Sequence, residues 1–321
     1  MGNTMGRGTA WRAGVGAVLA VATACGASGK GEQGYPSPDG GGSSSGSASG
    51  GGSGSSGGSF LGDGGGSSSG GGGSGCASGA EFVYVVDVTG IIYQFNPPTL
   101  AFTKVGTVSC AGSSFFSMAV DRNAVAWVLT QSGTIAKYDI NAKTCAPTSY
   151  KAGQQGFQTF GMGFASDTAG GTAETLFVTD DDLTLPSANK GLARIDTSAL
   201  TLTPVAQYDQ LKGTEAELTG TGDGRLFGAF EGSPYTVAEI DKTTGHIVSV
   251  APQSGINYAP SSSSLAFAFW GGDFYLFVGP GGTTDVFHYQ PSAHTTTNVE
   301  TVQFEIVGAG VSTCAPTVPP Q

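Results

Sequence analysis

The chain has 321 residues, of which 55 are glycine, and it carries a formal net charge of −11. Its 13 lysines and arginines form no basic cluster, which argues against a nucleic-acid partner, because such binding requires neutralisation of phosphates. The part from residue 80 onward is long enough to bury one well-filled hydrophobic core.

Residues 1–25 have the composition of a secretory signal peptide. Arg7 and Arg12 precede an apolar run over residues 13–21, which is too short to span a bilayer as a helix of the mature protein. The segment therefore predicts export from the cytoplasm.

The signal peptide ends in VATAC, which resembles a bacterial lipobox with its cysteine at Cys25. The resemblance implies cleavage before Cys25 and acylation of that cysteine, and Gly26 after it resembles lipoproteins that pass to the outer membrane. We therefore expect a protein of the bacterial cell envelope that is anchored in the lipid bilayer of the outer membrane. The alternative is an ordinary signal peptide cleaved near Ala24, because small-residue cleavage sites resemble one another.

Residues 26–80 predict a disordered linker. Glycine and serine dominate this stretch, and such a composition buries too little apolar surface to offset the entropy lost on ordering. A flexible chain of this length has a root-mean-square reach of roughly 40 Å. We expect a lipid anchor, a tether and one domain over residues 81–321, the alternative being a low-complexity insertion without a role.

An internal repeat organises the domain. Five strand-like runs each end in a polar residue that is followed by a turn-rich stretch, and the spacings between these residues are 43, 57, 45 and 49. Aspartate and asparagine hydrogen bond to their own backbone and so begin turns, which favours a turn role over a ring of functional carboxylates. The five polar residues are Asn96, Asp139, Asp196, Asp241 and Gln290.

Each repeat also contains a short run of aromatic and β-branched residues, typical of a buried strand. The five runs cover residues 82–87, 126–130, 176–180, 226–230 and 274–278. No long stretch shows helical periodicity, and a repeat of about 40–50 residues with four strands is the period of a propeller blade. The sequence therefore predicts an all-β fold, a β-propeller of about five four-stranded blades.

The innermost strand of each blade is predicted from small residues in one register, where backbones converge near the axis. The aligned positions are Ala119, Gly163, Gly220, Ala268 and Ala309. The last of these lies in a C-terminal strand, whereas the first repeat lacks an innermost strand of its own. We therefore expect the C-terminal strand to complete the first blade and close the ring, which removes open sheet edges.

Six strings in the domain are distinctive. They are YVVD (84–87), SMAVDR (117–122), GQQGFQTFGMGF (153–164), AELTGTGDGRLFG (216–228), AFAFWGGDF (266–274) and IVGAGVSTCAP (306–316). Through them the chain resembles an uncharacterised family of bacterial lipoproteins that have a Gly/Ser-rich tether and a β-propeller-like domain. The resemblance covers roughly residues 80–316 and implies no particular activity.

Four cysteines remain after acylation of Cys25, and an even number in an exported domain indicates two disulfides, with three possible pairings. Cys314 follows the proposed innermost strand of the first blade, and Cys76 precedes the next strand of that blade. A bond between them would replace the hairpin that joins these strands in other blades. We therefore predict the disulfide Cys76–Cys314, which leaves Cys110 to pair with Cys145.

An acidic run lengthens the third repeat. Asp180, Asp181 and Asp182 offer the carboxylate oxygens that Ca²⁺ prefers, so they are the candidate metal ligands, and calcium is the one cofactor that the sequence indicates. The alternative is a solvated acidic loop.

No catalytic residue is assigned, because the three histidines show none of the spacings of a metal-dependent or nucleophilic enzyme. Glu215, Glu217 and Asp273 are candidates to face the propeller axis near the acidic run. Carboxylates in that place would support hydrolase or lyase chemistry.

The predicted anchor and tether and the lack of catalytic spacings favour a surface-tethered, non-catalytic propeller that binds a protein or glycan as a monomer. One alternative is a calcium-dependent, lactonase-like hydrolase or lyase acting at the channel mouth, and another is a structural envelope component. Convergent carboxylates at the mouth would favour the enzyme, whereas an apolar or aromatic patch would favour the binder. Trp127, Trp270 and Tyr275 are the aromatic candidates, although strand aromatics more often belong to the core.

Overall fold

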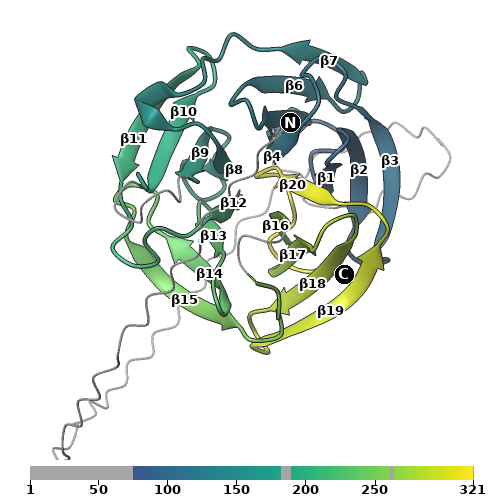
Figure 1. Cartoon of the computed structure of the whole chain (residues 1–321), viewed down its shortest axis with the longest axis vertical. Coiled ribbons are helices and arrows are strands. Elements are labelled where there is room, and N and C mark those ends of the chain that lie inside the picture. Colours follow the sequence, from purple (N-terminus) through teal and green to yellow (C-terminus); the bar gives the residue numbers. More distant parts are fainter. Residues whose placement is uncertain (1–74, 182–188, 260–263, 321) are drawn as a thin grey trace, which may run out of the picture. The chain divides into compact units, whose positions relative to one another are not determined.

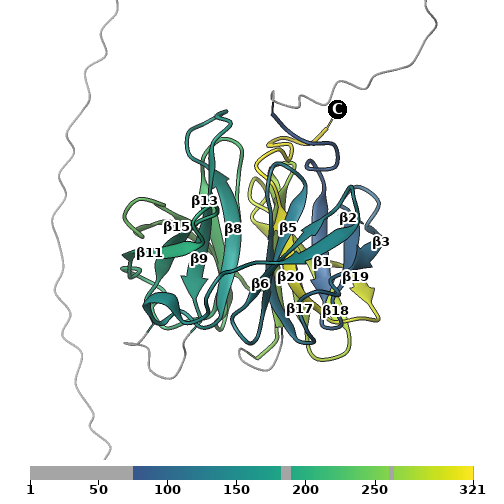
Figure 2. The same cartoon turned by 90° about the horizontal axis from the view of Figure 1, so that it is seen from above.

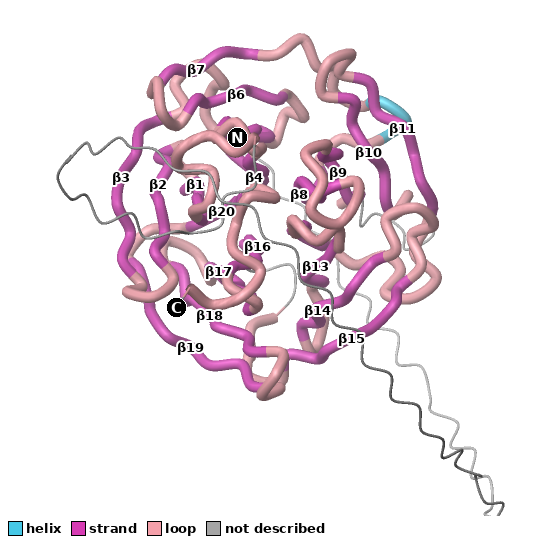
Figure 3. The backbone as a smooth tube through the Cα atoms, turned by 180° about the vertical axis from the view of Figure 1, so that it is seen from behind, coloured by secondary structure: helices cyan, strands magenta, loops and turns pink. Residues whose placement is uncertain are grey.

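The computed structural model of the protein describes residues 75–181, 189–259 and 264–320. These residues form antiparallel strands and loops, with one short 3₁₀ helix at Gln154–Gly156 beside β11 (Thr201–Ala206) (Figure 3). Within the described residues, no helix is long and apolar enough to cross a bilayer.

Five four-stranded sheets form a ring of blades around a central axis (Figure 1). From axis to rim, blade 1 contains β20 (Ile306–Val311), β1 (Val83–Asp87), β2 (Ile91–Asn96) and β3 (Ala101–Thr107). Blade 2 contains β4 (Phe115–Val120), β5 (Val125–Thr130), β6 (Ile135–Asp139) and β7 (Thr144–Pro147). Blade 3 contains β8 (Phe160–Ser166), β9 (Glu174–Asp180), β10 (Leu192–Asp196) and β11. Blade 4 contains β12 (Ala216–Gly220), β13 (Leu226–Phe230), β14 (Tyr235–Ile240) and β15 (Ile247–Gln253). Blade 5 contains β16 (Ser264–Trp270), β17 (Asp273–Gly279), β18 (Thr284–Gln290) and β19 (Thr295–Val302).

The predicted all-β propeller of five blades is thus confirmed, as is its closure by the C-terminal strand. The last strand, β20, pairs antiparallel with the first, β1, so that Ala309 lies opposite Val85 (Figure 1). β20 also contacts the inner strands β4 and β16 of the two neighbouring blades, which completes the circle. In the view turned by 90°, β8 lies to the left of the centre and β20 to the right (Figure 2).

Close approach of inner strands explains the small residues near the axis. A Cβ atom added at Gly163 would lie 2.7 Å from the carbonyl oxygen of Leu218, and one at Gly220 would lie 2.2 Å from that of Phe164. In β20 the glycines that meet β4 are Gly308 and Gly310, one residue to either side of the expected Ala309. The predicted strand is correct, and GAG offers a small residue on both of its faces, with Gly308 and Gly310 toward β4.

The repeated polar residues take the predicted turn role in blades 2, 3 and 4. Asp139 accepts hydrogen bonds from the backbone N–H groups of the second and third residues after it, and so does Asp196. Asp241 accepts a backbone bond and a hydroxyl bond from Thr243. These carboxylates therefore organise turns between the third and fourth strands.

The hydrophobic core lies between the blades and is rich in aromatic rings. Phe95 of blade 1 packs edge-on against Tyr275 of blade 5, with ring centroids 5.2 Å apart. Trp127 of blade 2 packs similarly against Phe164 of blade 3. Trp127 and Tyr275 are both buried, as the core interpretation predicts for strand aromatics.

The described domain begins N-terminal of the expected boundary at residue 81. Ala80 is fully buried, and the backbone N–H of Ala77 donates to the carbonyl oxygen of Arg122 in the loop that follows β4. Cys76 is bonded to Cys314, as described below. Residues 76–80, predicted as the end of the linker, thus belong to the propeller.

Candidate functional site

All inner strands begin at the same end of the propeller, and a cavity of about 380 Å³ opens there. We call it the channel mouth. Its lining comes from all five blades and includes the half-buried Phe116 and the exposed Gln131, and no lysine, arginine or histidine is among the described residues that line it. Five carboxyl groups converge on it, those of Asp181, Glu215, Glu217, Glu231 and Glu305.

Glu217 is buried and links three inner strands. Its side chain, on β12, accepts a hydrogen bond of 2.7 Å from the Ser117 hydroxyl on β4 and another from the backbone of Met162 on β8. Burial raises the pKa of Glu217 well above its ordinary value, and repulsion by Asp181 and Glu231 raises it further. Glu217 faces the axis, as expected, and its surroundings favour the neutral form of its carboxyl group.

Glu215 and Glu231 form a pair of carboxyl groups at the same side of the mouth. The Glu231 backbone N–H donates to the Glu215 carbonyl oxygen at 2.8 Å, and the two side chains hydrogen bond to each other. Such a bond requires a proton on one partner, and burial raises the pKa of Glu215 in agreement with this. Burial is the larger influence on Glu215, and the hydrogen bond with Glu231 acts in the opposite direction by lowering the pKa of Glu215.

The loop after β17 is held against the mouth by Glu305. One of its carboxylate oxygens accepts a bond of 3.1 Å from the backbone N–H of Gly282, and its carbonyl oxygen accepts one from Val88. The mouth thus combines hydrogen-bond donors and acceptors with an apolar wall that includes Phe116. This combination suits an uncharged ligand with several hydroxyl groups and disfavours an anion.

The acidic run does not converge on one point. Asp180 is buried within blade 3, where one carboxylate oxygen accepts a bond of 2.7 Å from the Lys190 backbone and lies 3.3 Å from its ammonium group. Asp181 points instead to the mouth and accepts a bond from the Thr159 hydroxyl, and Asp182 lies outside the described residues. Among the residues that the structure places, no three acidic, histidine or cysteine side chains gather in a metal-binding arrangement, so the calcium site stays a prediction.

Asp273 is not part of the mouth, contrary to expectation. It starts β17, at the opposite end of the channel, and its carboxylate lies 2.8 Å from the His288 ring on β18. That ring stacks on Tyr275 with a centroid distance of 4.7 Å. The expectation was wrong because the second strand of a blade runs back toward the mouth, so its first residue lies far from it.

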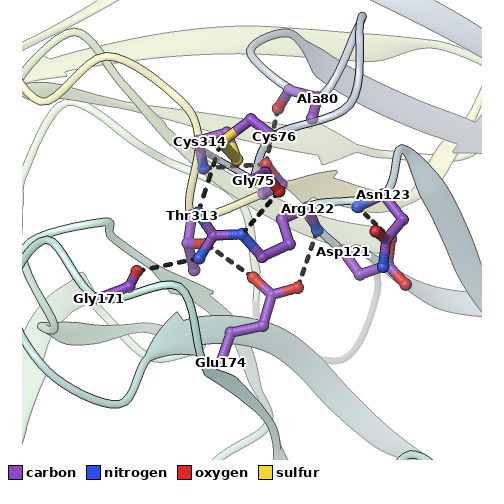
Figure 4. The surroundings of a disulfide bond; sticks show 11 residues. Gly75, Cys76, Ala80, Asp121, Arg122, Asn123, Gly171, Glu174, Thr313 and Cys314 are labelled. Carbon is purple, nitrogen blue, oxygen red and sulfur yellow. Dashed lines mark hydrogen bonds between the residues drawn. A yellow bond between two sulfur atoms is a disulfide. The ribbon is translucent and has the colours of Figure 1, made fainter. Parts of the chain in front are cut away.

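The opposite end of the channel carries the predicted disulfide Cys76–Cys314, which the structure confirms with Cα atoms 6.0 Å apart (Figure 4). The Arg122 side chain beside it donates to the carbonyl oxygens of Gly75 and Gly171. Glu174 receives hydrogen bonds from the Arg122 backbone and the Thr313 hydroxyl (Figure 4). This network joins the start of the domain, its C-terminal segment and blades 2 and 3.

The second predicted disulfide, Cys110–Cys145, is also confirmed. Cys110 follows the outermost strand of blade 1, and Cys145 lies in the outermost strand of blade 2, so the bond fastens two blades at the rim. The predicted acylation site, Cys25, lies outside the described residues.

Sequence reasoning did not identify Glu231 and Glu305 as residues of the mouth. A usable pattern exists, because the residue directly after the second strand lines the cavity in four blades. These residues are Val88, Gln131, Asp181 and Glu231. Aligning the ends of these strands would therefore have found Glu231, whereas Glu305 lies in a connection between blades and has no such repeat position.

The fold and its mouth define a five-bladed β-propeller with a carboxyl-lined channel. No protein-family model matches the chain, and no curated protein matches its sequence. Among solved structures, a chain in the crystal structure of a nidogen/laminin complex is similar, with a TM-score of 0.46 and 12% sequence identity over 71% of this chain and 97% of that chain. This degree of similarity does not bear on function, for which the site itself is the guide.

Proposed function

We propose that this protein is a lipid-anchored propeller of the bacterial cell envelope that binds a glycan at the channel mouth without converting it. The observation that carries the proposal is the cavity of about 380 Å³ at the mouth, to which all five blades contribute and on which five carboxyl groups converge. Small-molecule sites are concave cavities of about this size with a few convergent polar groups.

The chemistry of the mouth favours a glycan over other ligands. Carboxyl groups with and without a proton both donate to and accept from sugar hydroxyls, and Phe116 adds an apolar surface for the ring carbons. Anionic ligands would meet like charge. A large protein interface has less support, because only four large hydrophobic side chains are exposed in the described part of the chain, namely Val88, Val248, Val250 and Val318, and no more than two of them, on β15, are close in sequence.

The anchor is inferred from the sequence alone. An apolar run that ends in a lipobox-like cysteine, followed by a Gly/Ser-rich stretch, suits an acylated Cys25 that holds the domain away from the bilayer. Labelling cells with a radioactive or clickable fatty acid tests it, since Cys25→Ser should abolish incorporation. Incorporation that persists in this variant would refute the anchor without touching the binding proposal.

A hydrolase or lyase is the second candidate, because convergent carboxyl groups with a raised pKa are the usual equipment of acid–base catalysis. The binding function has more support, since Glu217 is 5% exposed and its carboxyl group already accepts a hydrogen bond from Ser117. Proton transfer to a ligand would require this group to leave its partners.

The binding proposal is testable with the secreted full chain carrying Cys25→Ser. We expect it to bind neutral or amino-sugar glycans on a printed array and to ignore sialylated and uronic acid glycans. Glu231→Gln and Phe116→Ala should each weaken binding at least tenfold, and Glu300→Gln on the exposed face of β19 should leave it unchanged. Absence of any glycan binding, or equal binding by all variants, would refute it, and products released from a bound glycan would favour the enzyme.

A further inference from the structure

A second cavity, of about 280 Å³, lies between blades 4 and 5 and is separate from the channel mouth. We call it the interblade groove. Two rows of paired residues face each other across it, one from each blade. The blade 4 row is Phe227, Glu239 and Ser249, and the blade 5 row is Phe269, Phe274 and Tyr289.

Arg225 is held rigidly at the edge of this groove. Its Nε and Nη2 atoms donate to the two carboxylate oxygens of Glu239 at 2.9 and 2.7 Å, and its guanidinium lies 4.6 Å from the centre of the Phe227 ring. Its backbone makes three hydrogen bonds with Thr221. The Arg225 side chain is nevertheless 49% exposed, so a planar pair of charged groups is presented to solvent in one orientation.

Blade 4 differs here from blades 2 and 5, which carry a related arrangement. In those blades a basic side chain on the third strand stacks on the aromatic residue directly opposite on the second strand. Lys137 lies 3.7 Å from the Trp127 ring in blade 2, and His288 stacks on Tyr275 in blade 5. In blade 4 the position opposite the aromatic residue holds Glu239, and the cation comes from Arg225 before β13.

This exchange places a carboxylate and a guanidinium side by side in a groove that Phe227, Phe274 and Tyr289 also line. The Arg225 and Glu239 charges balance each other, and Asp223, which also lines the groove, leaves a net negative charge that disfavours an anion. The pair still offers hydrogen-bond donors and acceptors. A pyranose ring has the matching chemistry, with adjacent hydroxyls that bond to both groups and a C–H face that packs on aromatic carbon.

We propose that the interblade groove is a second, independent glycan subsite that holds one neutral pyranose ring through Arg225 and Glu239. It goes beyond the function proposed for the channel mouth, because none of the residues that line the mouth lines the groove. Two sites on one domain would strengthen the attachment to a repeating polysaccharide by engaging it twice.

Protein-observed NMR of the full chain with Cys25→Ser tests the proposal, with methyl β-D-glucopyranoside and N-acetyl-D-glucosamine as probes. We expect saturable shifts of the Arg225 and Ser249 amide signals at millimolar sugar. Arg225→Met and Ser249→Trp should each weaken this response at least tenfold, the first by removing the donors and the second by filling the groove from an exposed strand position.

Two controls separate this subsite from other effects. Lys137→Met removes the related cation in blade 2 and should leave the groove response unchanged, and so should Glu231→Gln, which alters only the channel mouth. Thermal melting shows whether each variant is folded. If Arg225→Met does not fold, the response of Ser249→Trp to the sugars tests the proposal. Absence of groove shifts with both sugars, unchanged shifts in folded Ser249→Trp, or shifts produced instead by a proline-rich peptide would overturn the proposal.

Discussion

Cys76 and Cys314 are separated by 238 positions in the sequence, yet a disulfide joins them at the place where the first and last strands of the ring pair. In the other blades a hairpin makes the connection between the two innermost strands. The bond therefore takes the part of a covalent hairpin in blade 1.

Removing this bond should destabilise the domain more than removing the other one. The chain-entropy argument gives about 5 kcal/mol for a loop as long as that of Cys76–Cys314, and about 4 kcal/mol for Cys110–Cys145 with its separation of 35. Denaturant unfolding of the two double serine variants measures the difference. Equal stability of the wild type and the Cys76→Ser/Cys314→Ser variant would show that the ring closes without covalent help.

Glu217→Gln should stabilise the protein at neutral pH and have no effect in acid. Because the folded state raises the pKa of Glu217, folding retains a proton that the unfolded chain releases, and the stability of the wild type falls as pH rises above the ordinary pKa of a glutamate. The amide imitates the neutral acid and avoids this loss. Melting curves should show the variant a few degrees more stable at neutral pH and equal to the wild type near about pH 4.

An opposite result, with the variant less stable at neutral pH, would mean that the Glu217 carboxylate is ionised in the channel. Glu300→Gln, at an exposed position on β19, is the matched control and should change stability little at either pH.

Asp180 and Asp181 should respond differently to the same substitution. Asp180→Asn removes the charge that faces Lys190 inside blade 3 and should lower the free energy of unfolding by about 1–2 kcal/mol. Asp181→Asn changes a half-buried residue of the mouth and should cost less than about 0.5 kcal/mol. Similar losses in both would contradict the separate placement of the two side chains.

The same variants test the calcium prediction. A calcium site on the acidic run would appear as a melting temperature that rises with Ca²⁺ and falls with EDTA, and Asp181→Asn should reduce this response. Equal melting temperatures of the wild type in Ca²⁺ and in EDTA would contradict the prediction of a calcium site.

Limited proteolysis tests the predicted tether. A protease that cuts between small residues should cleave within residues 26–74 and leave a resistant fragment that begins near Gly75, because Cys76 is bonded to the propeller. Mass spectrometry of the fragment gives its first residue. Resistance of the whole chain would show that the tether is folded.

Much of the fold follows from the sequence because it depends on local patterns that recur. The turn aspartates Asp139, Asp196 and Asp241 mark the blades, and the missing strand of the first repeat leaves one place for the C-terminal strand. The disulfides followed from that closure. The glycines through which β20 approaches β4, Gly308 and Gly310, were not predicted, because GAG offers a small residue on both faces of the strand.

The candidate site was harder to predict because it depends on which loops meet at one end of the channel. Side chains of consecutive residues along a strand point to opposite sides. Asp180 therefore faces Lys190 inside blade 3, whereas the adjacent Asp181 lines the channel mouth. The partner of Asp180 is Lys190, which follows an insertion in the sequence. The insertion has no repeating pattern from which this pairing could be predicted. Arg225 and Glu239 were also missed, because their pairing appears only when the facing strands of blade 4 are placed in register.

The disulfide at the start of the domain also determines how a pull on the chain is carried. Tension applied at Gly75 reaches Cys76 and passes through the bond to Cys314, and from there to β20, which is packed between β4 and β16. The load is therefore shared by the centre of the ring, and β1 is not peeled away from its blade one hydrogen bond after another. With the bond reduced, the same force would act first on β1, so mechanical strength would depend on this one covalent link.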